Sequence, residues 1–147
     1  MTHEPLRRSL ANVAFTTTTP FTADGASVHR EAVRENTAAL VEAGAELVIP
    51  CGNTGEYYAL GRDERVAVVA ETVAAVDGDA TVLAGAGGSV PEVTDLAEAY
   101  LDAGADGVMV QFADHTHIHE RGALEYDRGV ADAVDAGLVV YKRGPQV

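Results

Sequence analysis

The feature that most constrains the fold is a strict alternation of short apolar segments with longer amphipathic ones. Four longer segments show apolar residues at helical spacing, at 28–43, 62–76, 90–103 and 122–135. The short segments that flank them are almost continuously apolar, as is typical of parallel strands buried on both faces, and lie at 12–18, 46–50, 81–87, 107–112 and 137–143. This alternation predicts an α/β fold with one parallel sheet of five strands and four helices, either doubly wound or barrel-like.

The length and composition of the chain predict a single domain. No linker or low-complexity segment interrupts the 147 residues, which suffice for one hydrophobic core. No apolar run reaches the roughly 18 residues of a membrane span, and residues 1–15 lack the apolar region of a secretory signal. Cys51 is the only cysteine, so an internal disulfide is excluded, and we expect a cytoplasmic protein.

The charge balance is strongly acidic. The net charge is −13, with 23 acidic against 10 basic residues, and Lys142 is the only lysine. This balance argues against nucleic acid and anionic membrane surfaces as partners. It also predicts a halophilic protein, because salt screens the repulsion between the acidic groups.

Candidate functional residues gather where the predicted strands end. Doubly wound sheets and barrels both bind ligands at the carboxyl ends of their strands. The unusual residues of this sequence lie in the corresponding segments, 16–21, 51–58, 85–89, 111–119 and 141–144. This coincidence indicates an enzyme.

The turn after the second strand reads Cys-Gly-Asn-Thr-Gly-Glu, residues 51–56. Gly52 and Gly55 would allow positive φ angles and close backbone approach, so that successive N–H groups converge on an anion such as a carboxylate. A plain strand-to-helix turn explains the same residues equally well. Neither a dinucleotide-binding fingerprint nor a phosphate-binding loop is present.

Two further loops have simpler explanations than a binding site. The glycine-rich stretch 85–89 is expected to clear space at the floor of a pocket rather than to cradle phosphate. His115, His117 and His119 alternate and could share one face of an extended segment, as in a zinc site. No cysteine or carboxylate pattern accompanies them, so we favour solvated or locally bonded histidines and predict no metal.

The last strand ends in Tyr141 and Lys142. A tyrosine there could transfer protons, with help from its neighbours because its unperturbed pKa is roughly 10. Lys142 is the only amine side chain able to form a Schiff base. Successive strand residues point to opposite faces, so we place Tyr141 in the interior and Lys142 at the rim.

These motifs, in this order, resemble the dihydrodipicolinate synthase / N-acetylneuraminate lyase superfamily of Schiff-base aldolases and dehydratases. TTTTPFTADGASVHREAV (16–33) is similar to the family's opening Thr-Pro-Phe, Asp-Gly and first helix, and GNTGEYYALGRDER (52–65) to its Gly-Thr-Thr-Gly-Glu signature. The third, fourth and fifth strands match at VLAGAGG (82–88), AGADGVMV (103–110) and VVYKR (139–143). The resemblance implies a (β/α)8 TIM barrel, of which residues 1–147 form the N-terminal portion.

The resemblance also implies the chemistry and the site. A barrel lysine forms a Schiff base with a 2-keto acid, no cofactor is needed, and we expect a homo-oligomer. Gly52, Asn53, Thr54 and Gly55 would bind the substrate carboxylate, Thr19 would line the floor, and Tyr141 would be catalytic. Asn53 departs from the first threonine of the signature.

Two departures bear on the reaction. Phe112-Ala113-Asp114-His115 stands where synthases carry Pro-Tyr-Tyr, which argues against synthase activity. The segments GNTGEYY (52–58) and YKR (141–143) look closer to the branch that dehydrates 2-keto-3-deoxy sugar acids, so we favour dehydration over the alternatives, a pyruvate-dependent aldolase or 4-hydroxy-tetrahydrodipicolinate synthase. The family lysine ends the sixth strand, whereas this sequence stops just past the fifth. We therefore expect the Schiff-base lysine to be absent and the chain alone to have little activity. A noncatalytic partial barrel is a further alternative.

Overall fold

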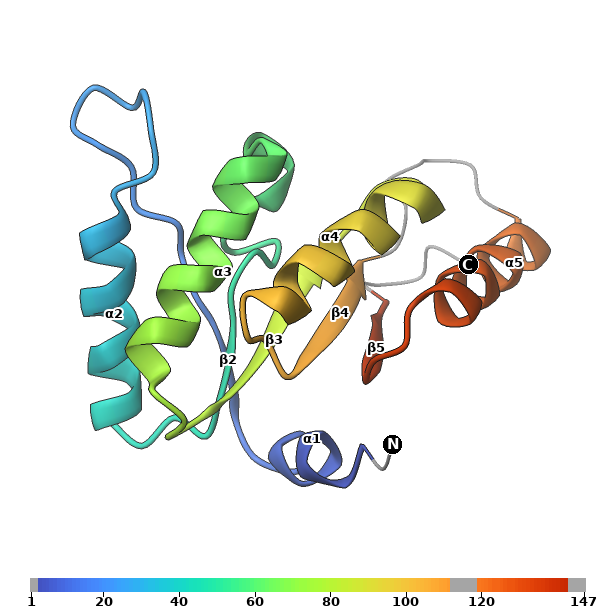
Figure 1. The fold of residues 1–147 in the computed structure, drawn as a ribbon, viewed down its shortest axis with the longest axis horizontal. Coiled ribbons are helices and arrows are strands. Elements are labelled where there is room, and N and C mark those ends of the chain that lie inside the picture. Colours follow the sequence, from blue (N-terminus) through green and yellow to red (C-terminus); the bar gives the residue numbers. More distant parts are fainter. Residues whose placement is uncertain (1–2, 112–118, 143–147) are drawn as a thin grey trace.

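The computed structural model describes residues 3–111 and 119–142, which form one five-stranded parallel sheet (Figure 1). Its strands follow one another in sequence order. They are β1 (Ala14–Thr16), β2 (Leu47–Ile49), β3 (Thr81–Ala86), β4 (Gly107–Gln111) and β5 (Leu138–Tyr141). All five lie within the segments predicted from apolar runs, and each is shorter than its segment.

The predicted helices are present between the strands. They are α2 (Arg30–Glu42), α3 (Arg62–Val76), α4 (Val90–Asp102) and α5 (Glu120–Ala133), with a short 3-10 turn, η1 (Tyr57–Ala59), before α3. The start of α4 is fixed by a capping box: the Ser89 hydroxyl accepts a hydrogen bond from the Glu92 N–H, and the Glu92 carboxylate accepts one from the Ser89 N–H. Gly44 and Gly104 follow helices α2 and α4 with φ angles of 93° and 100°, which L-residues rarely adopt.

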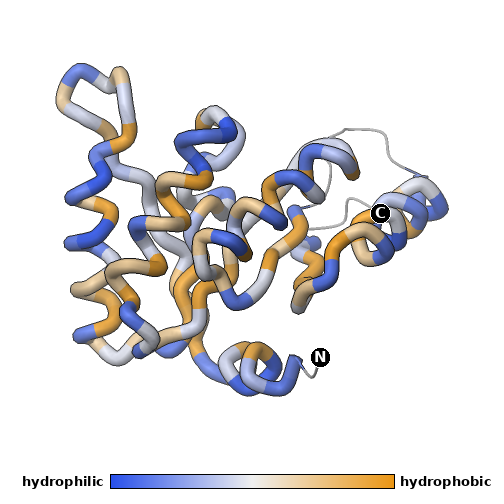
Figure 2. The backbone as a smooth tube through the Cα atoms, viewed as in Figure 1, coloured by the Kyte–Doolittle hydropathy of each residue, from blue (hydrophilic) through white to orange (hydrophobic). Residues whose placement is uncertain are grey.

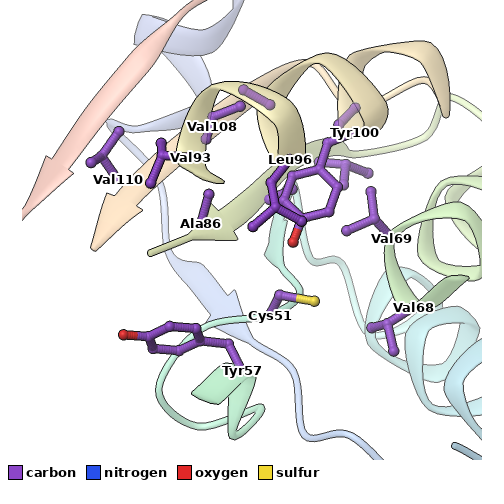
Figure 3. Close-up of a cluster of buried hydrophobic side chains, with 14 of the residues drawn as sticks. Cys51, Tyr57, Val68, Val69, Ala86, Val93, Leu96, Tyr100, Val108 and Val110 are labelled. Carbon is purple, nitrogen blue, oxygen red and sulfur yellow. The ribbon is translucent and has the colours of Figure 1, made fainter. Parts of the chain in front are cut away.

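One face of the sheet, called here the outer face, packs against helices α2–α5. Val48, Val82 and Val108 project from it into a core that is completed by residues of all four helices. Figure 3 shows part of this core, including Val108 of β4, Val69 of α3 and Leu96 of α4. Figure 2 shows apolar residues concentrated along the central strands, with hydrophilic residues on the exposed sides of the helices. A doubly wound sheet would carry helices on both faces. The sequential strand order with helices on one face is instead that of a barrel segment.

The opposite face, called here the inner face, carries a second and smaller core. Leu47, Leu83 and Met109 project from neighbouring strands and are almost fully buried. Leu6 joins them from α1 (Glu4–Ser9), a helix that the sequence analysis did not predict. Helix α1 lies below the amino ends of the strands (Figure 1), so Leu6 closes the bottom of the inner face.

The two edge strands are the least covered parts of the sheet. Phe15 on β1 is 38% exposed and Val140 on β5 is 51% exposed, although both are large apolar residues. Each of these strands pairs with a single neighbour among the described residues. This is the pattern of a partial barrel, since a closed barrel leaves no unpaired strand edge. No helix within the described residues is long and apolar enough to cross a membrane.

Candidate active site at the carboxyl ends of the strands

The turn after β2 is built by its own backbone hydrogen bonds. The Gly52 carbonyl accepts from the N–H groups of Gly55 (3.0 Å) and Tyr57 (3.4 Å), and the Asn53 carbonyl accepts from Glu56 (3.1 Å). The N–H groups of Asn53 and Thr54 have no hydrogen-bond acceptor within 3–111 and 119–142. Asn53 is half-buried and Thr54 is exposed. Two adjacent N–H groups at the mouth of the inner face therefore remain available to bind an anion.

Of the two glycines of this turn, only Gly55 lies so close to neighbouring atoms that a side chain would not fit. The expectation that Gly52 and Gly55 adopt positive φ is wrong, because the positive angles belong to Cys51 (56°) and Glu56 (53°). A Cβ on Gly55 would lie 3.0 Å from the Thr17 carbonyl oxygen and 3.2 Å from Thr19 Oγ1. Gly55 thus permits the expected close approach, between the turn and the segment after β1.

Two threonines connect the end of β1 to this turn. Thr19 Oγ1 donates a hydrogen bond of 2.7 Å to the Gly55 carbonyl, so this predicted floor residue holds the turn in place. Thr16 Oγ1 donates to Thr54 Oγ1 at 3.1 Å. Thr16 was not singled out in the sequence, where it begins a run of four threonines. Together these bonds place the Thr54 hydroxyl beside the carboxyl end of β1.

Tyr141 lies at the carboxyl end of β5, on the inner face of the sheet. Val139 packs against the inner core, and Tyr141, two residues further along β5, projects from the same face. Tyr141 is 39% exposed and pairs in register with Gln111 on β4. Lys142 follows directly after β5, and its predicted place at the rim stays a prediction.

Gln111 is a site residue that the sequence analysis missed. It ends β4 on the inner face, is only 2% exposed, and donates a hydrogen bond of 2.9 Å from Nε2 to the Cys51 carbonyl. The available signal was a single amide closing an otherwise apolar strand. This bond joins the end of β4 to the turn after β2.

The glycines at the end of β3 were expected to clear space at the floor of a pocket, but the space that they leave is taken by protein atoms. A Cβ on Gly85 would lie 2.2 Å from the Cys51 carbonyl oxygen, and one on Gly87 would lie 2.8 Å from the Tyr57 ring. Tyr57 itself is buried, and the Arg65 guanidinium lies over its ring at 5.3 Å. The stretch therefore lets the turn pack closely on β3 rather than forming a phosphate cradle.

Cys51 is enclosed by the outer core, below the site. Its side chain points toward Tyr100 and helix α3 (Figure 3), and it is fully buried. Burial raises the pKa of the Cys51 thiol to about 12, which outweighs the opposing effects of Tyr100 and Arg65. A thiol with such a pKa is a poor nucleophile at neutral pH, so Cys51 is a core residue.

The histidine run lies mostly outside the described residues, which exclude His115 and His117. His119 caps α5, where its Nδ1 accepts a hydrogen bond of 3.2 Å from the Arg121 N–H. No cluster of three or more potential metal ligands occurs in the described part of the chain. The departure at Phe112–His115 likewise lies outside the described residues.

Comparison with known proteins agrees with this geometry. The chain is 36% identical over 124 residues to a 4-hydroxy-tetrahydrodipicolinate synthase from Sorangium cellulosum, covering 84% of this chain and 41% of that protein. It is 38% identical over 126 residues to the synthase of the same name from Natronomonas pharaonis, covering 84% and 42%. The chain thus spans less than half the length of these relatives.

Solved structures show the same fold. The dihydrodipicolinate synthase from Bacillus clausii superimposes with a TM-score of 0.93 at 33% identity, covering 97% of this chain and 48% of that one. The synthase from Oceanobacillus iheyensis gives a TM-score of 0.87 at 32% identity, covering 95% and 47%. The profile of the Dihydrodipicolinate synthetase family matches residues 9–146. The chain therefore belongs to the Dihydrodipicolinate synthetase family, and its described residues form part of a TIM barrel.

Proposed function

We propose that this chain forms the carboxylate-binding part of a lyase that acts on a 2-keto acid through a Schiff base. The observation that carries the proposal is the turn after β2, whose Asn53 and Thr54 N–H groups lack acceptors among the described residues. A substrate carboxylate would accept hydrogen bonds from both N–H groups and from the Thr54 hydroxyl. Gly55 lets the turn lie close to the segment after β1, and Thr19 holds the turn there.

Tyr141 is proposed as the group that moves the proton. It projects from the inner face of β5, the face above which the bound keto acid would lie. An imine makes the carbon next to it acidic, because the cationic nitrogen accepts the electrons released on deprotonation. A tyrosine near that carbon can take up the proton as its phenolate and return it as its hydroxyl.

We do not expect Lys142 to be the amine that forms the imine. Lys142 directly follows Tyr141, which faces the inner side, so strand alternation directs the lysine elsewhere. The resemblance places the imine lysine on a sixth strand. We therefore expect little turnover by the 147-residue chain alone.

The reaction favoured for the complete site is dehydration of a 2-keto-3-deoxy sugar acid. Its support is the likeness of GNTGEYY (52–58) and YKR (141–143) to the dehydrating branch of the family, together with the sequence at 112–115, which lacks the Pro-Tyr-Tyr typical of synthases. A pyruvate-dependent aldolase or synthase is the second candidate, and the relatives from Sorangium cellulosum and Natronomonas pharaonis favour it, since both are 4-hydroxy-tetrahydrodipicolinate synthases. Product analysis separates them: a dehydratase releases water without chain cleavage, whereas an aldolase releases or consumes pyruvate.

Borohydride reduction in the presence of pyruvate, followed by mass spectrometry, tests the assignment of the amine. We expect no trapped adduct on the 147-residue chain. An adduct on Lys142, with turnover that Lys142→Ala abolishes, would contradict the assignment.

A pyruvate titration followed by NMR tests the binding turn separately. We expect shifts at residues 52–55 that Thr54→Ala weakens and Tyr141→Phe leaves in place. Absence of pyruvate binding would favour a noncatalytic partial barrel, and sedimentation would show whether the chain forms the expected homo-oligomer.

A further inference from the structure

Gln111 reaches from β4 across the inner face to the turn after β2. Its Nε2 lies 2.9 Å from the Cys51 carbonyl oxygen, and the residue is almost completely buried. A carbonyl oxygen can only accept a hydrogen bond, so the amide must present its nitrogen to Cys51. The orientation of the Gln111 side chain is therefore fixed by chemistry as well as by packing.

The strand between these two residues leaves room for the contact. Gly85 lies on β3, and a Cβ there would come 2.2 Å from the Cys51 carbonyl oxygen and 3.0 Å from Gln111 Nε2. No side chain larger than hydrogen fits without displacing that carbonyl. The position of the Cys51 carbonyl oxygen thus depends on two neighbouring strands. Gln111 on β4 donates a hydrogen bond to it, and Gly85 on β3 has no side chain that would displace it.

The carbonyl that Gln111 holds belongs to a strained residue. Cys51 has a φ of 56°, in the left-handed region that residues other than glycine seldom adopt. Such a conformation persists only where the surrounding structure holds it. The Cys51 carbonyl and the Gly52 N–H share one planar peptide unit. Fixing the carbonyl therefore fixes how the chain enters the turn at 52–55.

The other amide atom of Gln111 shows that packing alone does not explain this residue. Oε1 is buried and has no hydrogen-bond partner in the described part of the chain. A buried acceptor without a partner is destabilising, whereas an apolar side chain of similar length beside Met109 would avoid this cost. The contribution that an apolar residue could not make is the bond to Cys51.

We infer that Gln111 is a positioning residue for the carboxylate-binding turn. By holding the peptide between Cys51 and Gly52, it sets the direction in which the Asn53 and Thr54 N–H groups meet a carboxylate. The inference rests on the proposed function, because it takes a carboxylate to be the ligand of this turn.

Gln111→Met tests the inference, since it keeps the side-chain length and removes the donor. Leu83→Val is the control: it also changes a buried inner-face side chain, on β3, but leaves the hydrogen bond to the Cys51 carbonyl in place. Both variants of the full 147-residue chain are titrated with pyruvate by NMR. We expect Gln111→Met to raise the Kd for pyruvate about five- to tenfold, the effect of losing one ordinary hydrogen bond. Leu83→Val should leave the Kd within about twofold of wild type.

The free protein gives a readout that does not depend on ligand. Backbone chemical shifts of Cys51 report its φ, and we expect Gln111→Met to release it from the positive region and to shift the amides of 52–54. Gly85→Ala adds a methyl group on β3 that displaces the Cys51 carbonyl. It should shift the same resonances, and it replaces Gln111→Met as the test variant if Gln111→Met does not fold.

The positioning role of Gln111 and the proposed carboxylate binding are contradicted by different results. Unchanged Cys51 shifts and an unchanged Kd in Gln111→Met would overturn the positioning role. If wild type binds no pyruvate, the proposed function fails, while the Cys51 shifts of the variants still decide whether Gln111 holds the turn.

Discussion

At the scale of single residues, Gly52 and Gly55 occupy one turn but meet different surroundings. A Cβ on Gly52 would make only ordinary contacts, 3.8–3.9 Å from Met109, Ile49 and Thr16. A Cβ on Gly55 would press against the Thr17 carbonyl at 3.0 Å. The two positions therefore differ in how strictly they require glycine.

Alanine substitutions separate these two roles. We expect Gly55→Ala to lower the free energy of unfolding by about 1–3 kcal/mol, because the turn must move away from β1. Gly52→Ala should change it by less than about 1 kcal/mol. Urea denaturation measures both values. Equal losses in the two variants would show that the backbone of the turn adapts freely.

The candidate site could be predicted from the sequence only in part. Sequence patterns indicate local structure, but they do not indicate contacts between residues that are far apart in the chain. The position of the turn at 51–56 followed from its place after an apolar run. The hydrogen bonds of Thr16 and Gln111 did not, because they join residues 38 and 60 positions apart. The φ of Cys51 was also missed, since glycine is the residue expected to adopt such angles.

At the scale of elements, helix α1 closes the inner core from below. Leu6 is 6% exposed, and Cβ atoms on Gly107 and Gly137 would lie 2.9 Å and 2.7 Å from its side chain. The helix has only six residues, too few to show helical periodicity in the sequence. Tertiary packing, rather than a local pattern, determines that it forms.

Leu6→Ala tests this role of α1. Removing a nearly buried leucine leaves a cavity between α1 and the strands, so we expect a loss of about 2–5 kcal/mol in the free energy of unfolding. Leu10→Ala is the control, because Leu10 follows the same helix and is 41% exposed. Urea denaturation of both variants gives the comparison, and equal stabilities would contradict the role of Leu6.

Helices α2 and α3 are joined by an ion pair between Arg34 and Glu71. The hydrogen bond from Arg34 holds the pKa of the Glu71 carboxyl below its ordinary value of 4.5, against the opposing effect of burial. A lowered folded-state pKa means that the pair stabilises the protein above about pH 4.5, and that this contribution is lost as pH falls through the lowered value.

Glu71→Gln should therefore reduce stability at pH 7 and make the acid side of the stability curve less steep. Urea midpoints between pH 7 and pH 3 check this expectation. Glu98→Gln, at an exposed position on α4, is the control. A variant curve parallel to wild type down to pH 3 would show that the pair contributes nothing through this carboxyl.

At the scale of the whole molecule, the sequence predicted more than it did for single residues. In the described part of the chain, the alternation of segments predicted all five strands and four of the five α-helices, because burial on both faces leaves a strong apolar signal. The family resemblance implied a barrel, which the structure confirms. The alternation alone left open the choice between a doubly wound sheet and a barrel. That choice depends on which side each helix packs, and no local pattern records that side.

The excess of acidic residues gives a prediction for the molecule as a whole. With a net charge of −13, repulsion among the acidic groups should weaken the fold in dilute buffer. Added KCl shortens the screening length from about 10 Å at 0.1 M to about 3 Å at 1 M, so the thermal midpoint should rise with KCl. Full stability in dilute buffer would count against a halophilic protein.

The burial of Cys51 has a consequence for following this molecule in time. The sequence contains one sulfhydryl, and that group is sealed between β2, α3 and α4, so an alkylating reagent can reach it only when the layer of helices separates from the sheet. The rate of alkylation then reports how often the outer core opens, and it does not report local opening of the edge strands β1 and β5. The chain thus carries its own single-site probe of global opening, with no label to introduce.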